Sequence, residues 1–124
     1  IPAVMEAHQM ATQAARVGFD WPDAGAALLK LDEETSELKT ALAAGGDHAA
    51  LHEEVGDLLF VAVNVARLLG VDPEAALKAA NRKFRRRFRH VENGLKAQGR
   101  KPADATLLEM DALWDEAKRQ EKNG

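Results

Sequence analysis

A chain of 124 residues, 46% hydrophobic and 30% charged, is long enough for one buried core and short for two ordinary domains, so we expect a single domain over residues 1–124. The absence of cysteine excludes a disulfide framework and a thiolate metal site, and it is compatible with a cytoplasmic protein. The net charge of -3 does not favour bulk binding to nucleic acid.

The first predicted element is a helix over residues 2–16, whose apolar stripe is weak. Asp20 and Pro22 interrupt the helical pattern, and Pro22 disfavours the helical conformation at Trp21. We interpret Phe19 and Trp21 in this loop as plugs for one end of the core, with nucleobase stacking as the alternative.

A second helix is predicted over residues 23–43, where apolar residues recur at helical spacing. Its stripe comprises Ala24, Leu28, Leu31, Thr35, Leu38 and Leu42. Glu34 and Glu37 project roughly 60° and roughly 120° to one side of this stripe. For a single pair, a solvated ladder in which Lys30 meets Glu34 is the simpler interpretation.

A third helix, which includes residues 53–69, carries apolar side chains in nearly every direction in its second half, so other helices must cover it. Glu54 and Asp57, at positions i and i+3, project from one face. Because helices joined by a short loop normally pack antiparallel, we expect Glu34 and Glu37 to face Glu54 and Asp57. The apolar run is too short to span a bilayer, so no membrane contact is expected.

Four converging carboxylates form an oxygen-rich, negative site that suits Mg²⁺ or Mn²⁺ better than zinc. A carboxylate-bridged di-iron bundle is the competing metal site, but it needs Glu-x-x-His pairs, and the chain has none. His48 and His52, at positions i and i+4, are interpreted as polar residues of the first turns of the third helix rather than as metal ligands.

A fourth helix is predicted from Asp72-Pro73-Glu74, a helix-start signal, to about Lys96. Its stripe comprises Leu77, Asn81, Phe84, Phe88, Val91 and Leu95, and around it lie Arg82, Lys83, Arg85, Arg86, Arg87, Arg89 and His90. By projection Arg86 points away from the core, whereas Lys83 and Arg87 share an inward flank. Nucleic acid is a less favoured ligand for these cations, because the aromatic residues are aligned for packing rather than for base stacking.

Thr106 and Glu109 predict a capping box at the start of a final short helix, which we expect to fray after about residue 119. Trp114 and Lys118 lie one turn apart on this helix and share a face. Taken alone, they would be a core aromatic residue and a surface lysine.

Together these segments resemble the MazG family of nucleoside triphosphate pyrophosphohydrolases. The resemblance rests on VGFDWPD, on Glu33-Glu34-x-x-Glu37, on EEVGDLLFVAVNVARLLG, and on NRKFRRRFRHVE followed by Trp114 and Lys118. It covers most of the chain and is greatest to the C-terminal catalytic domain of the two-domain bacterial members.

This resemblance implies an all-α bundle of about four to five helices, completed by homodimerisation. It implies hydrolysis of a nucleoside triphosphate to the monophosphate and pyrophosphate, with Mg²⁺ as cofactor and a role in cleaning the nucleotide pool. It assigns metal ligation and catalysis to Glu34, Glu37, Glu54 and Asp57, and nucleotide contacts to Lys83, Arg87, Trp114 and Lys118. The alternative from another class is a non-catalytic helical module whose basic helix binds an acidic partner or nucleic acid.

Overall fold

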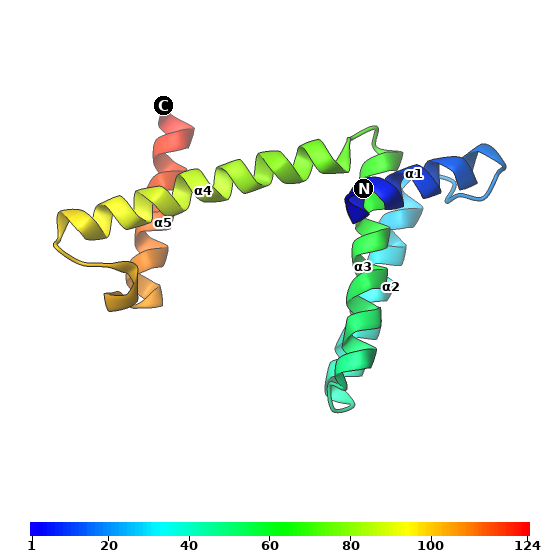
Figure 1. Ribbon diagram of the computed structural model, residues 1–124, viewed down its shortest axis with the longest axis horizontal. Coiled ribbons are helices and arrows are strands. Elements are labelled where there is room, and N and C mark those ends of the chain that lie inside the picture. Colours follow the sequence, from blue (N-terminus) through cyan, green and yellow to red (C-terminus); the bar gives the residue numbers. More distant parts are fainter. The chain divides into compact units, whose positions relative to one another are not determined.

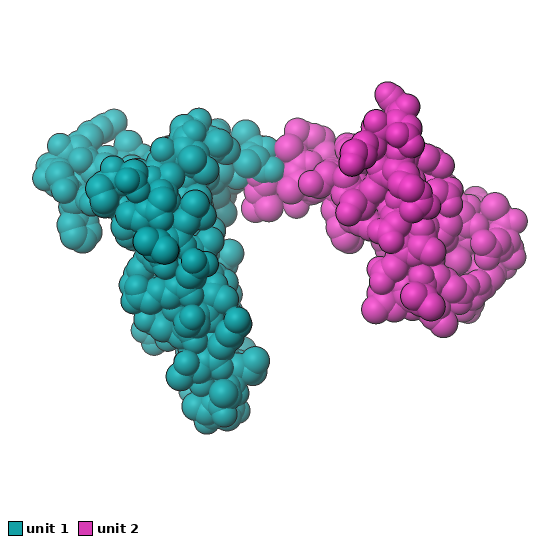
Figure 2. All heavy atoms as spheres, turned by 180° about the vertical axis from the view of Figure 1, so that it is seen from behind, with its two compact units in different colours: residues 1–76 teal, residues 77–124 magenta.

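The computed structural model describes residues 1–124 as five α-helices and one short 3₁₀-helix, with no strand, which confirms the predicted all-α class (Figure 1). The helices are α1 (Ala3–Arg16), α2 (Ala24–Ala43), α3 (His48–Leu68), α4 (Pro73–Ala97), η1 (Pro102–Asp104) and α5 (Leu107–Asn123). None of them combines the length and the apolar character needed to cross a membrane. The chain divides into two compact units, Ile1–Ala76 and Leu77–Gly124 (Figure 2).

Local capping chemistry sets where the helices begin. The side chain of Asp23 accepts a hydrogen bond of 2.8 Å from a backbone N–H in the first turn of α2. Asp47 does the same at the start of α3, and Thr106 and Glu109 form the predicted capping box of α5. These bonds satisfy backbone donors that a helix start leaves free, so the sequence alone locates these starts closely.

In the first unit, α2 and α3 lie side by side, and α1 also packs on α3 (Figure 1). The connection between α2 and α3 contains Gly45 and Gly46, whose φ angles are 122° and 67°. Glycine adopts this left-handed region without the steric cost that a Cβ brings, so the chain reverses within a few residues. The two helices therefore form the antiparallel hairpin that the short loop predicts.

The buried face of α2 differs from the predicted stripe. Leu28 and Leu42, which were expected in the stripe, are 45% and 64% exposed, whereas Ala27 and Glu34 are buried. Ala27 and Glu34 lie two turns apart and thus on one face of the helix. This part of the prediction is wrong. The predicted stripe followed the large apolar residues, whereas the face of α2 that is buried contains the small Ala27, and α2 packs mainly on α3.

Helix α3 is apolar nearly all round, as predicted, but this chain covers it only in part. Val61 and Asn64 are buried, whereas Leu59 and Phe60 are exposed. Large apolar side chains exposed together on one helix are typical of a surface that another protein covers.

In the second unit, α5 crosses α4 (Figure 1). Side chains of the two helices are in contact, among them Phe84 with Trp114 and His90 with Glu116. Val91 and Leu95 of α4 and Ala117 of α5 are buried. A Cβ at Gly94 would lie 2.7 Å from Cδ2 of Leu113, so the glycine allows α5 to come this near.

Helix α5 continues to Asn123, so the predicted fraying after about residue 119 is wrong. Glu121 lies in the segment expected to fray, and it pairs with Arg86 and Arg87 of α4 at 3.2 and 3.0 Å. These ion pairs link the last turns of α5 to α4, an interaction between helices that local propensity does not contain.

Candidate functional site

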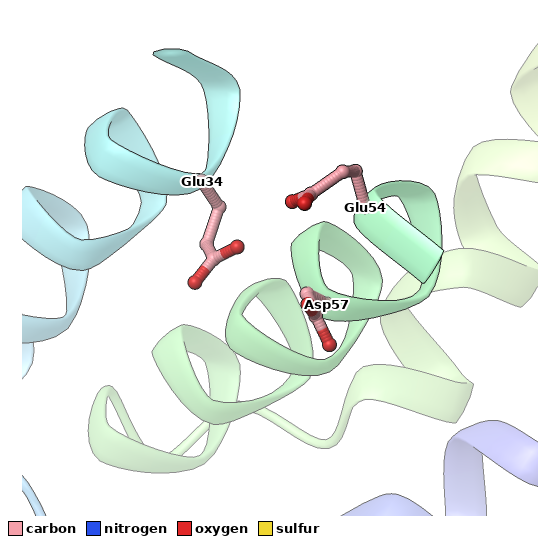
Figure 3. A group of neighbouring side chains, drawn as sticks. All are labelled: Glu34, Glu54 and Asp57. Atoms are coloured by element: carbon pink, nitrogen blue, oxygen red, sulfur yellow. The ribbon is translucent and has the colours of Figure 1, made fainter. Parts of the chain in front are cut away.

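Three of the four predicted carboxylates come together between α2 and α3. Glu34 projects from α2, and Glu54 and Asp57 come from α3 (Figure 3). One oxygen of each residue lies within 4.8 Å of the other two. The antiparallel hairpin produces this group, because it places the middle of α2 against the first half of α3.

Two oxygens of this group are buried and have no hydrogen-bond partner. They are Oε2 of Glu34, a residue that is only 6% exposed, and Oε2 of the half-buried Glu54. A buried carboxylate oxygen without a partner is costly, because it has lost its water. A hard divalent cation takes oxygens of this kind as ligands. The residues therefore fit the metal that the resemblance implies.

Lys30 supplies part of the counter-charge. Its Nζ lies 3.1 Å from Oε1 of Glu33 and 3.3 Å from Oε1 of Glu34. The hydrogen bond with Glu33, followed by the one with Glu34, raises the pKa of Lys30. The helical ladder expected for Lys30 and Glu34 is thus present, but Glu34 is buried rather than solvated. Lys30 engages one oxygen of Glu34 and leaves Oε2 free.

Glu37, the fourth predicted ligand, lies near this group but is not part of it. The negative charge of Glu34 raises the pKa of Glu37, and partial burial and the charge of Glu54 act in the same direction. The side chain is otherwise exposed. Negative charge therefore accumulates around Glu37, although its oxygens do not lie at the mutual spacing of the other three residues.

The predicted nucleotide contacts Arg87, Trp114 and Lys118 belong to the second unit, around the crossing of α4 and α5. The guanidinium carbon of Arg87 lies 5.7 Å from the ring centroid of Trp114, and the ring of Phe84 lies 5.4 Å from it on a tilted plane. Lys118 is exposed, and with Arg87 it borders a surface hollow of about 550 Å³. The lining of this hollow is completed by Asp115, Arg119, Glu121 and Lys122. The four cations outnumber the two carboxylates of this hollow, and such a positive balance suits an anionic ligand such as a phosphate chain.

Unlike Arg87, the α4 cations Lys83 and Arg86 do not line this hollow. Lys83 is exposed on α4 and does not line the hollow. Arg86 was expected to point away from the core, and its side chain is 60% exposed, but its Nε also donates to Oε1 of Glu121 at 3.2 Å. The outward direction of Arg86 is thus confirmed, and the ion pair is an addition that arises because α5 continues far enough to bring Glu121 to α4. Arg82 is exposed and forms no ion pair, so it is the better example of a solvated cation.

Sequence reasoning missed a polar group formed by Asp20, Asn64 and Arg67, of which Asn64 is buried. Nε of Arg67 lies 3.1 Å from Oδ1 of Asn64, and its Nη1 lies 3.0 Å from Oδ2 of Asp20. A signal was present, because Asn64 and Arg67 are the two polar residues that interrupt the apolar run of α3. Polar side chains in a buried helix need partners, and the partner here lies in the loop before α2.

An all-α chain with three carboxylates gathered in a helical hairpin belongs to the class of helical proteins with an acidic site suited to a divalent cation. Residues 24–92 match the family described as the MazG nucleotide pyrophosphohydrolase domain. The match includes all four predicted carboxylates, Lys83 and Arg87. The chain therefore belongs to the MazG nucleotide pyrophosphohydrolase family.

Curated relatives agree with this assignment. The chain is 45% identical over 122 residues to a nucleoside triphosphate pyrophosphohydrolase of Escherichia coli strain K12. The aligned segment covers 98% of this chain and 46% of the relative. It is 41% identical over 118 residues to the nucleoside triphosphate pyrophosphohydrolase/pyrophosphatase MazG of Thermotoga maritima. This second alignment covers 95% of this chain and 45% of that protein. The chain spans about half the length of these two relatives.

Proposed function

We propose that this chain hydrolyses nucleoside triphosphates to the nucleoside monophosphate and pyrophosphate, with Mg²⁺ as the metal and Mn²⁺ as a substitute. The observation that carries the proposal is the pair of buried, unpartnered oxygens on Glu34 and Glu54, with Asp57 beside them. Family membership supports the same reaction, because the relatives from Escherichia coli and Thermotoga maritima are named nucleoside triphosphate pyrophosphohydrolases.

In this reaction water adds across the bond between the α- and β-phosphates, and pyrophosphate leaves. Glu34, Glu54 and Asp57 are proposed to hold the metal, with Glu37 as the fourth carboxylate. The chemistry that Mg²⁺ supplies when bound is neutralisation of charge on the phosphate oxygens and activation of a water molecule. The reaction is a direct hydrolysis, so it needs no nucleophilic side chain and no covalent enzyme intermediate.

The cations of the second unit are proposed to bind the triphosphate. Arg87 offers a planar guanidinium whose donors match phosphate oxygens, and Lys83 and Lys118 add point charges. Trp114 offers an aromatic surface for the nucleotide. Nη2 of Arg87 already pairs with Oε2 of Glu121 at 3.0 Å, so a phosphate must compete with this carboxylate for the guanidinium.

We also propose that the active form is a homodimer. Leu28 and Leu29 on α2 and Leu59 and Phe60 on α3 are exposed in the single chain. A second copy that buries these side chains would remove a large apolar area from water, at roughly 25 cal/mol per Å². The exposed residues come from the helices that carry the carboxylates.

The proposal is tested by incubating the purified chain with Mg²⁺ and a panel of canonical and damaged nucleoside triphosphates, and by quantifying both products by ion-exchange chromatography. We expect equal amounts of monophosphate and pyrophosphate, and loss of both when the metal is chelated. Release of orthophosphate would identify a different scissile bond. Absence of pyrophosphate with every triphosphate and every divalent metal would favour the non-catalytic helical module instead.

A further inference from the structure

A polar network joins α3 to the loop that precedes α2. Arg67 donates from Nη1 to Oδ2 of Asp20 at 3.0 Å, and its Nη2 donates to Oδ1 of the same carboxylate. The guanidinium also donates to Oδ1 of Asn64, at 3.1 Å from Nε and 3.0 Å from Nη2. Asn64 in turn donates through Nδ2 to the backbone carbonyl of Phe60 at 3.0 Å. We call Asp20, Asn64 and Arg67 the Arg67 clamp.

The clamp is buried at Asn64 and only partly shielded at Arg67 and Asp20, and its geometry is specific. Asn64 is 1% exposed, and the side chains of Arg67 and Asp20 are 12% and 21% exposed. Oδ1 of Asp20 also accepts the backbone N–H of Trp21 at 2.8 Å, which fixes the carboxylate in its loop. The hydrogen bond from Arg67 lowers the pKa of Asp20, so the carboxylate stays ionised. A two-pronged arginine–carboxylate pair restricts both distance and orientation, which a single hydrogen bond does not.

The clamp lies at one end of the same helical hairpin that carries the three carboxylates. Asp20 lies just before Asp23, the N-cap of α2, and Arg67 lies in the last turn of α3. The clamp therefore closes the end of the α2–α3 hairpin that the chain itself leaves open. The other end is closed covalently by the loop with Gly45 and Gly46. Glu34, Glu54 and Asp57 lie between these two ends, with Asp57 about 15 Å from Arg67 along α3 at 1.5 Å per residue.

The carboxylate on α2 and the two on α3 repel one another across the hairpin. Three of their oxygens lie within 4.8 Å of one another, and like charges at this spacing repel strongly where water is partly excluded. Lys30 engages Glu34 but not the two carboxylates of α3. The force tends to separate α2 from α3 or to slide one along the other, and at the open end only non-covalent contacts oppose it.

We propose that the Arg67 clamp holds α2 at the spacing and axial register on α3 at which Glu34, Glu54 and Asp57 bind a divalent cation. Arg67 is thus a positioning residue that acts on the metal ligands of α3 from about three to four helical turns away. This inference rests on the metal site of the proposed function. It predicts a loss of metal affinity from substitutions that touch no ligand.

The test is Mn²⁺ binding to the full chain without nucleotide, measured from the electron paramagnetic resonance signal of free Mn²⁺. The variants are Arg67→Gln, Asp20→Asn and the double variant. Arg16→Gln is the matched control, because it removes the same charge from an exposed residue at the end of α1. We expect each clamp variant to weaken Mn²⁺ binding about tenfold, as loss of a ligand-orienting partner does. The double variant is expected to equal Arg67→Gln, and the control to stay within about twofold of wild type.

Helical circular dichroism separates positioning from folding. Asp20→Asn leaves Arg67 bonded to Asn64, so it disturbs the buried polar group less than Arg67→Gln does. Unchanged Mn²⁺ affinity in folded variants would overturn the clamp, as would loss of helicity in both single variants. Positioning also predicts that lost turnover returns when Mn²⁺ is raised about tenfold to match the weakened affinity.

The same measurements distinguish failure of the clamp from failure of the proposed function. A wild-type chain that binds Mn²⁺ but releases no pyrophosphate would refute hydrolysis alone, and loss of affinity in the variants would still support the clamp. A wild-type chain that does not bind Mn²⁺ would overturn both.

Discussion

Arg87 lies over the indole ring of Trp114, with its guanidinium carbon 5.7 Å from the ring centroid. The same side chain pairs with Glu121 and is only 17% exposed. Contact with an aromatic face and with a carboxylate holds the guanidinium in one place, and we expect this to orient it for the phosphate that would displace Glu121 in the proposed reaction. Lys83, one turn away on α4, is exposed and has no such support.

Replacing Arg87 or Lys83 by Ala is expected to lower kcat/KM for a nucleoside triphosphate roughly thirty- to a thousand-fold, because about 2–4 kcal/mol of transition-state stabilisation is lost. Arg82→Ala is the matched control, because Arg82 is a neighbouring arginine that is exposed and unpaired. It is expected to change kcat/KM by less than about threefold. If Arg82→Ala proves as damaging as Arg87→Ala, a basic surface for an acidic partner becomes the better interpretation.

Replacing Glu34, Glu37 or Glu54 by Gln, or Asp57 by Asn, is expected to abolish turnover while the helical circular dichroism persists. Each substitution relieves repulsion among the carboxylates, so the thermal midpoint in metal-free buffer is expected to stay equal or to rise. Glu33→Gln serves as the control, because Glu33 is exposed and meets only Lys30. Turnover lost together with helicity would assign these residues a structural role instead.

Acid is expected to weaken the start of α5. The hydrogen bond from Arg100 lowers the pKa of Glu109 from 4.5 to about 2, and the Thr106 backbone N–H acts in the same direction. Because the pKa is lower in the folded state, this contribution to stability is complete above about pH 4.5 and is lost as the pH falls towards about 2. Glu109→Gln keeps an acceptor for the capping box and removes the charge.

The measurement for this prediction is the urea midpoint of wild type and Glu109→Gln across the acid range, followed by circular dichroism. Wild type is expected to be the more stable above about pH 4.5, and its advantage is expected to vanish near pH 2. A constant difference between the two proteins at all pH values would show that the ionised pair with Arg100 does not contribute.

The chain is expected to sediment as a dimer at micromolar concentration, because single-chain α2 and α3 expose large apolar residues. Leu59→Lys places a charge on this surface and is expected to give an inactive monomer that is still helical. Val17→Lys alters an exposed apolar residue of the loop after α1 and is expected to leave the dimer intact. A fully active monomer of the wild-type chain would contradict the dimer.

Local chemistry in the sequence determined the helices and most of the acidic group. Asp23, Pro73 and Thr106 mark helix starts through bonds or restrictions within a few residues, so no tertiary information is needed. The convergence of Glu34 with Glu54 and Asp57 needed one further rule, that a short loop makes neighbouring helices antiparallel.

Tertiary structure decided which side of α2 is buried and which cations are free. Sequence periodicity favoured Leu28, but contact with α3 buries Ala27, because two helices approach most closely at small residues. The pairs Arg86–Glu121 and Asp20–Arg67 join residues far apart in the chain. Such pairs depend on where one helix crosses or flanks another, and hydrophobic periodicity within a single helix contains no information about that placement.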